Sequence, residues 1–577
     1  MSDARLFSRL PGPCVVWFAR AVERGILTPA DRALAATLAD LAGEIPPEIL
    51  GVYAVSAALT SAVSREGHTL LDLGAASASP YLDDLPDSLP ALSRWPGILA
   101  PVAGSPEDPG PLILDKEGLY LYRYYCAEVR VAETIGRRLI RDRGGPSLPA
   151  DSSLVDRFFP LAGPPSDPVN DGRRAAIASL SRSLLLLTGG PGTGKTWTAA
   201  RILALHSALF PLSRIVAAAP TGKAASRMAE AIAQAGFPGN PPPTMTLHRL
   251  LGAGLHGFTR GPGNPLDWDL VLVDELSMID LSLMDRLLSA LPERSRLVLT
   301  GDRDQLSSVG TGSVMSDLCA TLQGTERKGP EAGALTVLTH NFRQAGSQGL
   351  EAFGAAVASG DASRAFDLLE EGREGLSFIP AIPESPLPLG ALRDGWDKVL
   401  VPREGGEVSP IGLNSFMALT ALREGPVGSH AVNRSFHAHM RRYRGGDSFP
   451  SPVIILENSY ETGLMNGDLG VLYQSALFVQ KGSGSLSLPE RLAPKWEYAY
   501  AMTVHKSQGS EFDHVFLLLG GFDHPLLTRS LLYTGATRAK NRLTVWASRA
   551  ILERMLRRPL ERLSALSERL ADRISRS

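Results

Sequence analysis

Residues 184–200 read LLLLTGGPGTGKTWTAA, and this stretch decides the fold. Its four consecutive leucines, Leu184 to Leu187, predict a strand that is buried on both faces, as in a parallel sheet. The glycines that follow match the spacing G-x-x-x-x-G-K-T, which leads from a strand through a loop into a helix. The stretch therefore predicts a parallel α/β sheet with a phosphate-binding loop after one strand.

The predicted loop offers backbone N–H groups and a helix N-terminus to an anionic ligand. We assign nucleotide binding to the whole loop, which consists of Gly189, Gly190, Pro191, Gly192, Thr193, Gly194, Lys195 and Thr196. Lys195 is expected to contact the outer phosphates, and the Thr196 hydroxyl is expected to ligate Mg²⁺. The cofactors that the sequence predicts are therefore ATP and Mg²⁺.

Apolar runs and helical patterns alternate around this loop, as in RIVAAAPTGKAASRM, DLVLVDELSMID and RLVLTGDRDQL. That alternation is typical of an open parallel sheet in an α/β domain. Residues 170–340 are thus expected to form a first α/β domain, with a short insertion at about 236–268.

Polar groups follow two of these apolar runs. Asp274 in VDELSMID is placed to hold Mg²⁺ through water, and Glu275 is placed to act as the general base on an attacking water. Gln305 in GDRDQLSSVG can orient water or sense a γ-phosphate. A hydrolysis site then needs only a cation that neutralises charge on the γ-phosphate.

Two arginines outside the first α/β domain are candidates for that cation: Arg343 in LTHNFRQ and Arg538 in LLYTGATRAK. Such an arginine accelerates phosphoryl transfer by about 10³ to 10⁵. If it belongs to a second domain, the nucleotide lies between two domains, which close on binding and open after hydrolysis. This cycle is the mechanical requirement of a translocase.

The chain outside the first α/β domain divides into three further parts. Helical patterns predict a mainly helical domain at 1–143, and a Pro-, Gly- and Ser-rich stretch predicts a linker at 144–169. In 341–577 the runs FMALTAL, HVFLLLG and NRLTVWA predict a second parallel sheet. Turn-rich short strands at about 428–497 predict a small β-barrel inserted into it.

Two helical segments carry more specific expectations. Residues 117–143 have helical periodicity throughout. The tail at 551–574 has the apolar spacing of an amphipathic helix, and it is expected to pack on its own domain.

Composition sets further limits on the class of protein. With 577 residues, 44% of them hydrophobic, the chain reads as a multidomain soluble protein. Its net charge of −2 provides no global basic field, so a nucleic-acid partner would need a local basic channel. Three widely spaced cysteines form no zinc or disulfide pattern, which suits a reducing cytoplasm. Neither a signal peptide nor a membrane span is expected.

Eight stretches occur in the order and spacing of superfamily 1 helicases: GGPGTGKT, APTGKAASRM, TLHRLLG, VDELSMID, GDRDQLSSV, NFRQ, TVHKSQGSEFDHV and YTGATRAK. The set most resembles the RecD family, the alpha subunits of exodeoxyribonuclease V (RecBCD). ENSYETGLMNGDLGVL is similar to the inserted barrel of this family, and SREGHTLLDL to the N-terminal domain of its three-subunit form. The resemblance covers nearly the whole chain.

The resemblance implies two RecA-like P-loop motor domains, an SH3-like β-barrel inserted in the second, and a partner-docking N-terminal domain. It assigns contacts with single-stranded DNA to hydroxyl and imidazole side chains, namely Thr221, Thr246, His248, Thr503 and His505. Such groups bond phosphates without reading bases, which suits a motor that steps along any sequence. Gln508 and Glu511 are placed near the nucleotide.

The implied function is an ATP-dependent 5′–3′ DNA helicase subunit that acts on DNA ends in recombinational repair and DNA degradation. RecB-like and RecC-like subunits are the implied partners, with the nuclease site on the RecB-like subunit. Two alternatives stay open. One is a stand-alone RecD-like helicase or a conjugative relaxase module, although residues 1–165 show no helix-hairpin-helix repeats. The other is a non-translocating DNA-binding subunit with a regulatory ATP site.

The chain departs from the family pattern at one place. Many relatives carry a Gln about twenty residues before the phosphate loop, where it reads the adenine edge. This chain has no Gln before Gln234. Either Asn170 or a backbone group is left to take that role, and selectivity for the base is expected to be loose.

Overall fold

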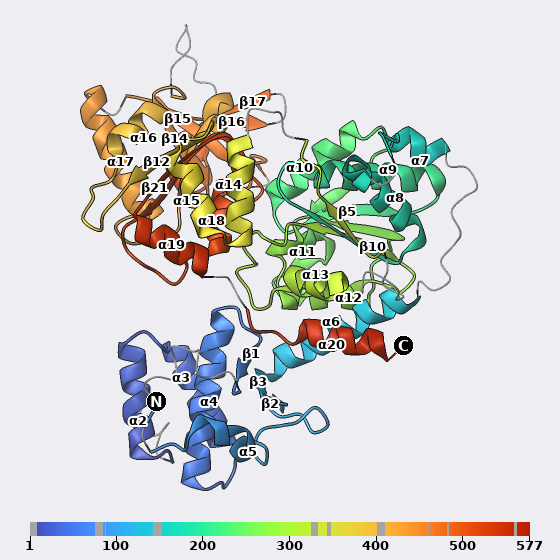
Figure 1. Cartoon of the computed structure of the whole chain (residues 1–577), viewed down its shortest axis with the longest axis vertical. Helices are drawn as coiled ribbons and strands as arrows, with labels where there is room; N and C mark the ends of the chain where they lie inside the picture. The colour runs from blue at the N-terminus through green and yellow to red at the C-terminus, as the bar shows by residue number, and fades with distance from the viewer. Residues whose placement is uncertain are drawn as a thin grey trace.

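The computed structural model describes most of the chain. The described ranges are 9–74, 85–86, 88–141, 153–164, 167–324, 333–342, 348–400, 410–446, 448–459, 461–481, 484–558 and 562–576. Two α/β lobes lie side by side, and the N-terminal region lies below both of them (Figure 1). Each lobe contains one parallel sheet, as the alternating patterns predict.

The first lobe is built on a six-stranded sheet with the order β11-β4-β10-β9-β5-β6, in which all neighbours run parallel. Its strands are β4 (Leu184–Gly189), β5 (Ile215–Ala219), β6 (Thr244–Thr246), β9 (Leu270–Val273), β10 (Arg296–Gly301) and β11 (Leu335–Leu338). Its helices are α7 (Ser153–Phe158), α8 (Asp171–Ser181), α9 (Lys195–Leu209), α10 (Gly222–Gln234), α11 (Leu247–Leu250), α12 (Leu281–Ala290) and α13 (Val314–Gly324). A small hairpin, β7 (Ala253–Gly254) and β8 (Gly257–Phe258), projects from the insertion.

The leucines of β4 show why this sheet is covered on both faces. Leu185 and Leu187 belong to the core that contains α8 and α9. Leu184 and Leu186 belong to the core that contains α12 and α13. Because successive side chains of a strand point to opposite faces, helices on both sides bury all four leucines.

The second lobe contains a five-stranded parallel sheet with the order β12-β21-β20-β13-β19. Its strands are β12 (Leu376–Pro380), β13 (Phe416–Thr420), β19 (Ala501–Thr503), β20 (Phe512–Gly520) and β21 (Ala539–Ala547). Its helices are α14 (Gln348–Ser359), α15 (Ala362–Glu370), α16 (Leu389–Trp396), α17 (Ser429–Arg444), α18 (Arg529–Ala536) and α19 (Arg549–Arg557). The three apolar runs predicted as strands form β13, β20 and β21.

A five-stranded antiparallel sheet is inserted between α17 and β19, with the order β17-β16-β15-β14-β18. Its strands are β14 (Ser451–Ile455), β15 (Leu469–Tyr473), β16 (Ala476–Lys481), β17 (Gly484–Pro489) and β18 (Trp496–Tyr498). Val453, Ile455 and Leu477 form part of a small core of its own. The segment expected to hold inserted strands, 428–497, thus contains α17 first and this sheet after it.

The N-terminal region is mainly helical, as predicted, and also contains a three-stranded antiparallel sheet, β1-β3-β2. Its elements are α2 (Gly12–Glu23), α3 (Pro29–Leu41), α4 (Pro47–Arg65), β1 (Leu70–Asp72), α5 (Trp95–Leu99), β2 (Leu112–Asp115), β3 (Gly118–Leu121) and α6 (Tyr122–Arg141). The expectation of a helix throughout 117–143 is wrong for its first turn. Residues 118–121 form the middle strand β3, because pairing with two neighbouring strands outweighs the local helical pattern.

Helix α4 is apolar along most of its length. Among the described residues it alone is long and apolar enough to cross a membrane, judged by length and composition. Within its most apolar window, however, 78% is buried inside the protein, where the helix packs against α3.

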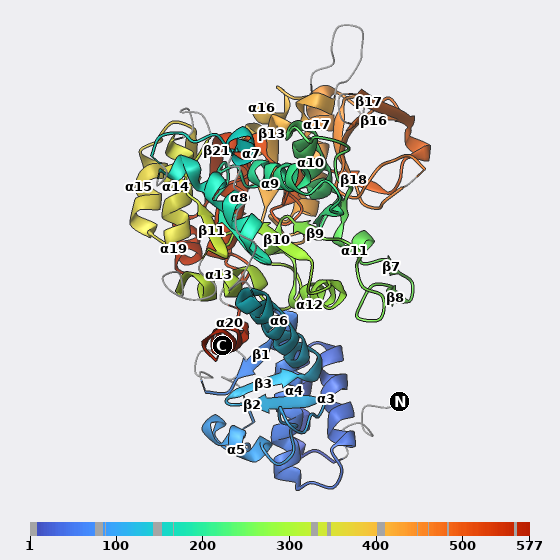
Figure 2. The ribbon, with the colours of Figure 1, turned by 90° about the vertical axis from the view of Figure 1, so that its right-hand side faces the viewer.

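The tail forms two helices rather than one. Helix α19 packs on the second lobe, whereas α20 (Leu566–Ser575) packs against α6 of the N-terminal region and α13 of the first lobe (Figure 2). Leu566, Leu570 and Ile574, spaced by four residues, put the apolar face of α20 into the core shared with α6 and α13. The expectation that the tail packs on its own domain is therefore confirmed for α19 and wrong for α20.

Candidate nucleotide-hydrolysis site

The phosphate loop connects β4 to α9. Gly194 has a φ of +79°, a left-handed conformation that favours glycine, directly before α9 begins. Gly189 has no room for a side chain, because an added Cβ would lie 2.6 Å from the Leu338 carbonyl oxygen. The Lys195 ammonium donates to the carbonyls of Gly189 and Gly190, at 2.6 and 2.9 Å. The sequence motif thus folds into a loop that wraps around the Lys195 side chain.

An acidic pair follows β9. Asp274 is buried and accepts hydrogen bonds from the Thr196 hydroxyl at 3.3 Å, the Glu275 N–H at 3.0 Å and the Thr300 hydroxyl. Glu275 has a φ of +56°, a strained conformation of the kind found at functional sites. Burial, followed by the charge of Asp274, raises the pKa of Glu275, and Arg538 opposes this rise. A carboxyl group with a raised pKa is suited to general-base chemistry.

The loop after β10 connects the two lobes. The Gln305 amide donates to Asp302 Oδ2 at 3.0 Å, and the Tyr533 hydroxyl donates to the same oxygen at 3.3 Å. The Leu306 N–H donates to Thr534 Oγ1 at 2.8 Å. Tyr533 and Thr534 lie on α18, so the loop that carries Gln305 is bonded directly to the second lobe.

Arg538 lies just after α18 and is only 4% exposed. Its guanidinium donates to the carbonyls of Thr534 and Ser510, at 3.2 and 3.3 Å. Burial lowers the pKa of Arg538, while the carboxylates of Glu275 and Glu511 oppose this shift. A buried cation of the second lobe thus acts electrostatically on Glu275 of the first lobe.

The two other predicted groups of the second lobe lie at the same junction. Gln508 donates to the Leu306 carbonyl at 3.3 Å. Glu511 pairs with Arg227 of α10 at 3.8 Å, and Arg227 also donates to the Gly509 carbonyl at 3.0 Å. The structure thus gathers most of the predicted site at one interface, namely Lys195, Thr196, Asp274, Glu275, Gln305, Gln508, Glu511 and Arg538.

Arg343, the other candidate for the cation, lies outside the described residues. Its neighbour Phe342 is described and donates its N–H to the carbonyl of Gly192 in the phosphate loop, at 3.0 Å. The NFRQ motif therefore begins in direct contact with the phosphate loop.

The candidate DNA contacts are distributed over both lobes. Three threonines, Thr221, Thr246 and Thr503, each accept a backbone N–H from three residues further along, at 3.2, 3.3 and 3.2 Å. The hydroxyls of Thr221 and Thr246 therefore also cap α10 and α11, and that of Thr503 stabilises the turn that follows β19. His248 is exposed on α11, whereas burial lowers the pKa of His505.

A cavity of about 460 Å³ brings two of these candidates together. Polar residues from both lobes contribute to its lining, including Thr221, His248, Asp280, Ser308 and Gln508. Thr246, Thr503 and His505 are not part of this lining. Ser308 comes from the same loop as Gln305, so the cavity adjoins the loop that carries one of the predicted nucleotide-site residues.

A second cavity, of about 350 Å³, adjoins the phosphate loop. Its lining includes Phe159, Asn170, Thr193, Trp197 and Phe342. The buried amide of Asn170 donates to the carbonyls of Ala162 and Pro164, at 2.7 and 2.8 Å, and accepts from the Ala162 N–H at 3.0 Å. Asn170 thus uses its amide to hold its own loop, which leaves a backbone group as the alternative for reading a base.

Sequence reasoning missed several groups that orient the site. Thr300 donates to Asp274, Tyr533 donates to Asp302, and Thr534 accepts from the Leu306 backbone. The signal for Tyr533 and Thr534 was their place in the same motif as Arg538, LLYTGATRAK. A buried hydroxyl needs a hydrogen-bond partner, but the sequence does not show which one.

Three family models match separate parts of the chain: an AAA domain at 173–311, a UvrD-like helicase C-terminal domain at 498–546, and the RecBCD enzyme subunit RecD, N-terminal domain, at 23–120. The chain is 34% identical over 584 residues to RecBCD enzyme subunit RecD of Mycobacterium tuberculosis (strain ATCC 25618 / H37Rv), covering 95% of this chain and 96% of that relative. The chain belongs to the RecD family. As a RecD-family member it is an ATP-dependent superfamily 1 DNA helicase of recombinational repair.

Other relatives separate two forms of the RecD family. RecBCD enzyme subunit RecD of Haemophilus influenzae is 30% identical, with 83% of this chain and 84% of that relative covered. ATP-dependent RecD2 DNA helicase of Deinococcus radiodurans is 31% identical, but only 50% of it is covered. Together with the match at 23–120, the fuller coverage places this chain with the relatives named RecBCD enzyme subunit RecD rather than with RecD2.

Among solved structures, a Pif1 helicase from Bacteroides in complex with ADP-AlF3 and ssDNA is similar at a TM-score of 0.36 and 17% identity. That similarity covers 63% of this chain and 88% of the Pif1 chain.

Proposed function

We propose that this RecD-family chain is the 5′–3′ translocase and helicase subunit of a RecBCD-type exodeoxyribonuclease V in the cytoplasm. The observation that carries the proposal is the junction between the lobes, where the Gln305 loop is bonded to α18 and the buried Arg538 after α18 acts by its charge on the pKa of Glu275. A site that needs both lobes couples nucleotide binding and hydrolysis to closing and opening between them. The 5′–3′ polarity rests on the resemblance to the family.

Hydrolysis is assigned to side chains of the first lobe. Lys195 binds the outer phosphates, Glu275 accepts a proton from the attacking water, and Gln305 orients that water. The Thr196 hydroxyl and the Asp274 carboxylate lie 3.3 Å apart and offer the oxygen ligands that Mg²⁺ prefers. When bound there, Mg²⁺ neutralises charge on the phosphates.

The second lobe supplies the groups that respond to the γ-phosphate. Arg538 and Arg343 neutralise charge that develops during phosphoryl transfer. Gln508 and Glu511 lie near the nucleotide, and Gln508 is bonded to the loop that carries Gln305. Loss of the γ-phosphate then weakens the attraction between the lobes, which opens the cleft.

DNA is proposed to cross both lobes as a single strand. Thr221, Thr246 and His248 contact it on the first lobe, and Thr503 and His505 on the second. Hydroxyl and imidazole groups bond the phosphates, so the motor steps along any sequence. The cavity that contains Thr221 and His248 adjoins the Gln305 loop, which supports communication between DNA and nucleotide.

The domain boundaries follow from the same assignment. Residues 170–340, with the insertion at 236–268, and residues 341–577 are proposed to be the two RecA-like motor domains. The inserted antiparallel sheet is proposed to be the SH3-like barrel of the second motor domain. Residues 144–169 are proposed to link the first motor domain to the N-terminal domain, and helix α7 within them packs on α9 of the first motor domain.

The N-terminal domain, residues 1–143, is proposed to dock on a RecC-like subunit. That contact holds this motor on one strand of a DNA end while a RecB-like motor takes the other strand. The nuclease site is assigned to the RecB-like subunit, because the carboxylates assigned in this chain serve ATP hydrolysis.

The test combines a DNA substrate series with a binding assay. The full-length chain, alone and with RecB-like and RecC-like subunits, is given ATP and duplexes with either a 5′ or a 3′ overhang. We expect DNA-stimulated hydrolysis, unwinding from the 5′ overhang, and capture of both partners in a pull-down. Unwinding from the 3′ overhang alone would refute the polarity. Hydrolysis without any strand displacement would instead support a DNA-binding subunit with a regulatory ATP site.

A further inference from the structure

The C-terminal tail joins parts of the protein that are far apart in the sequence. Residues 562–576 belong to the chain after the second lobe, yet they lie against the N-terminal region and the first lobe (Figures 1 and 2). The Leu563 N–H donates to His68 Nδ1 at 2.9 Å, and the Leu563 carbonyl accepts from the Thr69 N–H at 2.9 Å. The tail is thus bonded through its backbone to the segment that follows α4.

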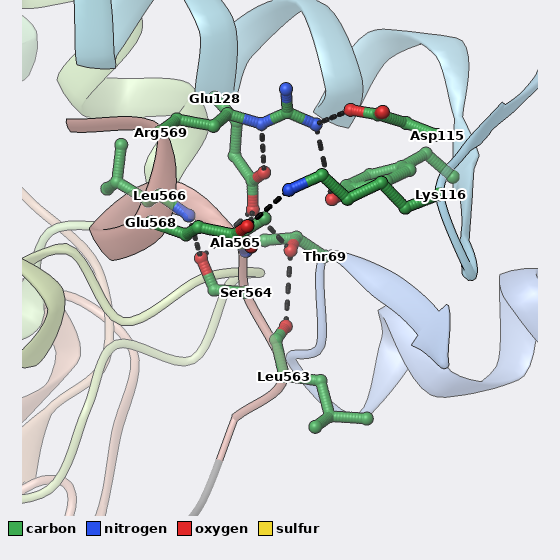
Figure 3. Close-up of polar contacts among 11 residues, drawn as sticks. Thr69, Asp115, Lys116, Glu128, Leu563, Ser564, Ala565, Leu566, Glu568 and Arg569 are labelled. Atoms are coloured by element: carbon green, nitrogen blue, oxygen red, sulfur yellow. Dashed lines mark hydrogen bonds and ion pairs between the residues drawn. The ribbon is translucent and has the colours of Figure 1, made fainter. Parts of the chain in front are cut away.

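Glu128 of α6 anchors the next part of the tail and is fully buried (Figure 3). Its Oε1 accepts from the hydroxyls of Thr69 and Ser564, at 2.5 and 2.9 Å. Its Oε2 accepts from Arg569 Nε at 3.3 Å. A buried carboxylate is costly unless it is paired and hydrogen-bonded, so the tail supplies partners that Glu128 needs.

Arg562 connects the tail to a loop of the first lobe. Its Nη1 donates to the carbonyls of Gly310 and Gly312, at 2.6 and 2.8 Å, and its Nη2 donates to the Ser308 carbonyl at 2.5 Å. The side chain also lies close to Gly67, where an added Cβ would be 2.5 Å from Arg562 Cζ. Burial lowers the pKa of Arg562 to about 10, so the guanidinium remains charged at neutral pH.

The N-terminal region holds the same loop from a second direction. The Gly312 N–H donates to the Gly67 carbonyl at 2.8 Å. The Thr311 hydroxyl donates to the Ser64 carbonyl at 2.8 Å. The end of α4, the tail and the loop at 308–312 therefore form one hydrogen-bonded junction.

The loop held at this junction begins at the nucleotide site. Gln305 and Leu306, three and two residues before Ser308, make the contacts with Asp302 and α18 described above. Ser308 and Gly310 also line the cavity that contains Thr221 and His248. A shift of the loop at its 308–312 end would move groups at both the nucleotide site and the DNA-facing cavity.

We propose that Arg562 is a positioning residue for ATP hydrolysis, which fixes the loop at 305–312 to the tail and the N-terminal region. The inference rests on the proposed motor function of the nucleotide site. A guanidinium suits this role, because its rigid fork reaches several carbonyls at once and loses little freedom in doing so. Removing the fork leaves three carbonyls without this donor and frees the loop to move. The N-terminal domain thereby acquires a direct mechanical connection to the Gln305 loop.

The test compares three variants of the full-length chain: Arg562→Ala, Arg562→Lys and Arg576→Ala. Arg576 is exposed at the end of the tail and serves as the matched control. We expect Arg562→Ala to lower DNA-stimulated kcat about tenfold while KM for ATP stays within about twofold, because misplacement weakens transition-state contacts. Arg562→Lys should recover part of the loss, and Arg576→Ala should match the wild type.

Hydrogen exchange measured without nucleotide gives a second, independent readout. In Arg562→Ala the backbone amides at 305–312 should exchange faster, while those of β4 and β9 stay protected. A wild-type kcat in Arg562→Ala would overturn the proposal, because Arg562 would then have no role in hydrolysis. Faster exchange throughout the protein would also overturn it, because the role of Arg562 would then be purely structural. Absence of DNA-stimulated hydrolysis in the wild type would refute the proposed function instead. The exchange measurement would still show whether Arg562 fixes the loop at 305–312.

Discussion

The loop at 302–312 has two ends that are held in different ways. At the first end, the Asp302 carboxylate accepts from the Gln305 amide and from the Tyr533 hydroxyl of the second lobe. At the other end, most contacts of the loop are made by its backbone, since the carbonyls of Ser308 and Gly312 accept from Arg562. The first end is defined by side-chain chemistry, whereas the second is defined by the path of the backbone.

This difference separates two ways in which a variant can impair the motor. At the nucleotide site a substitution removes a charge or a proton acceptor that the reaction uses, so the loss in rate is large. At the tail junction a substitution changes only where the loop lies, so the loss is smaller and falls on kcat. The following predictions test this ranking, from the largest effect to the smallest.

Lys195→Ala should reduce DNA-stimulated ATP turnover by at least about 10³, because the ammonium that binds the outer phosphates is lost. Fold stability should change little, since the hydrogen bonds of the ammonium go to two carbonyls of its own loop. Steady-state ATPase assays with single-stranded DNA and a thermal melt measure both effects. Lys398→Ala, an exposed lysine after α16, is the matched control. Turnover near the wild-type level in Lys195→Ala would show that the assigned site is wrong.

Arg538→Ala should slow hydrolysis at least about a hundredfold while ATP binding stays nearly normal, because the cation acts on charge that develops in the transition state. Arg538→Lys should recover little, since an ammonium does not reproduce the guanidinium fork. Arg542→Ala, four residues further along and exposed, is the control. Nucleotide affinity and single-turnover rate are measured separately. Equal losses in both quantities would assign Arg538 a structural role.

The part of the candidate nucleotide site in the first lobe was predictable because its groups lie in short motifs that follow apolar runs. Lys195, Asp274 and Gln305 follow three strands of one parallel sheet, β4, β9 and β10. Neighbouring parallel strands end at the same edge, so motifs distant in sequence come together without further information. The cation from the second lobe was predictable only as a need of the chemistry, which left Arg343 and Arg538 as candidates.

The contacts of the tail with the N-terminal region and the first lobe could not be predicted from the sequence, and the reason is physical. The spacing of Leu566, Leu570 and Ile574 shows that one face of a helix is buried, but it does not show which surface covers that face. Pro559 was the available signal that the tail is not a single helix. Glu128 gave no signal either, since a glutamate on a helix is most often exposed. Its burial depends on partners more than 400 residues away.

Glu275 should determine the acidic limb of the pH profile of kcat/KM for ATP. Its pKa in the folded protein is raised, so the deprotonated form that acts as general base is present above that pKa and is lost as pH falls through it. We expect activity to fall about tenfold per pH unit below this limb, at a pH above the usual glutamate value of about 4.3. Glu275→Gln should remove the limb together with most of the activity. A limb near 4.3 would refute the raised pKa.

The smallest predicted effect concerns the choice of base. The Asn170 amide is occupied by hydrogen bonds with Ala162 and Pro164. The cavity beside the phosphate loop is lined by the aromatic rings of Phe159, Trp197 and Phe342, which offer a base surfaces for stacking. Aromatic faces stack on any purine, so we expect kcat/KM for GTP to lie within about tenfold of that for ATP.

Trp197 provides the sharpest test of that expectation. The side chain is 50% exposed, packs edge-on against Phe159 at 6.0 Å between ring centroids, and carries the Arg201 guanidinium 3.9 Å from its ring centroid. If stacking holds the base, Trp197→Ala should lower kcat/KM for ATP and for GTP by the same factor. The ratio of the two kcat/KM values should then stay unchanged. Leu212→Ala, a fully exposed apolar residue after α9, is the control. An ATP preference above about 100-fold in the wild type would instead require a group that reads the adenine edge by hydrogen bonding.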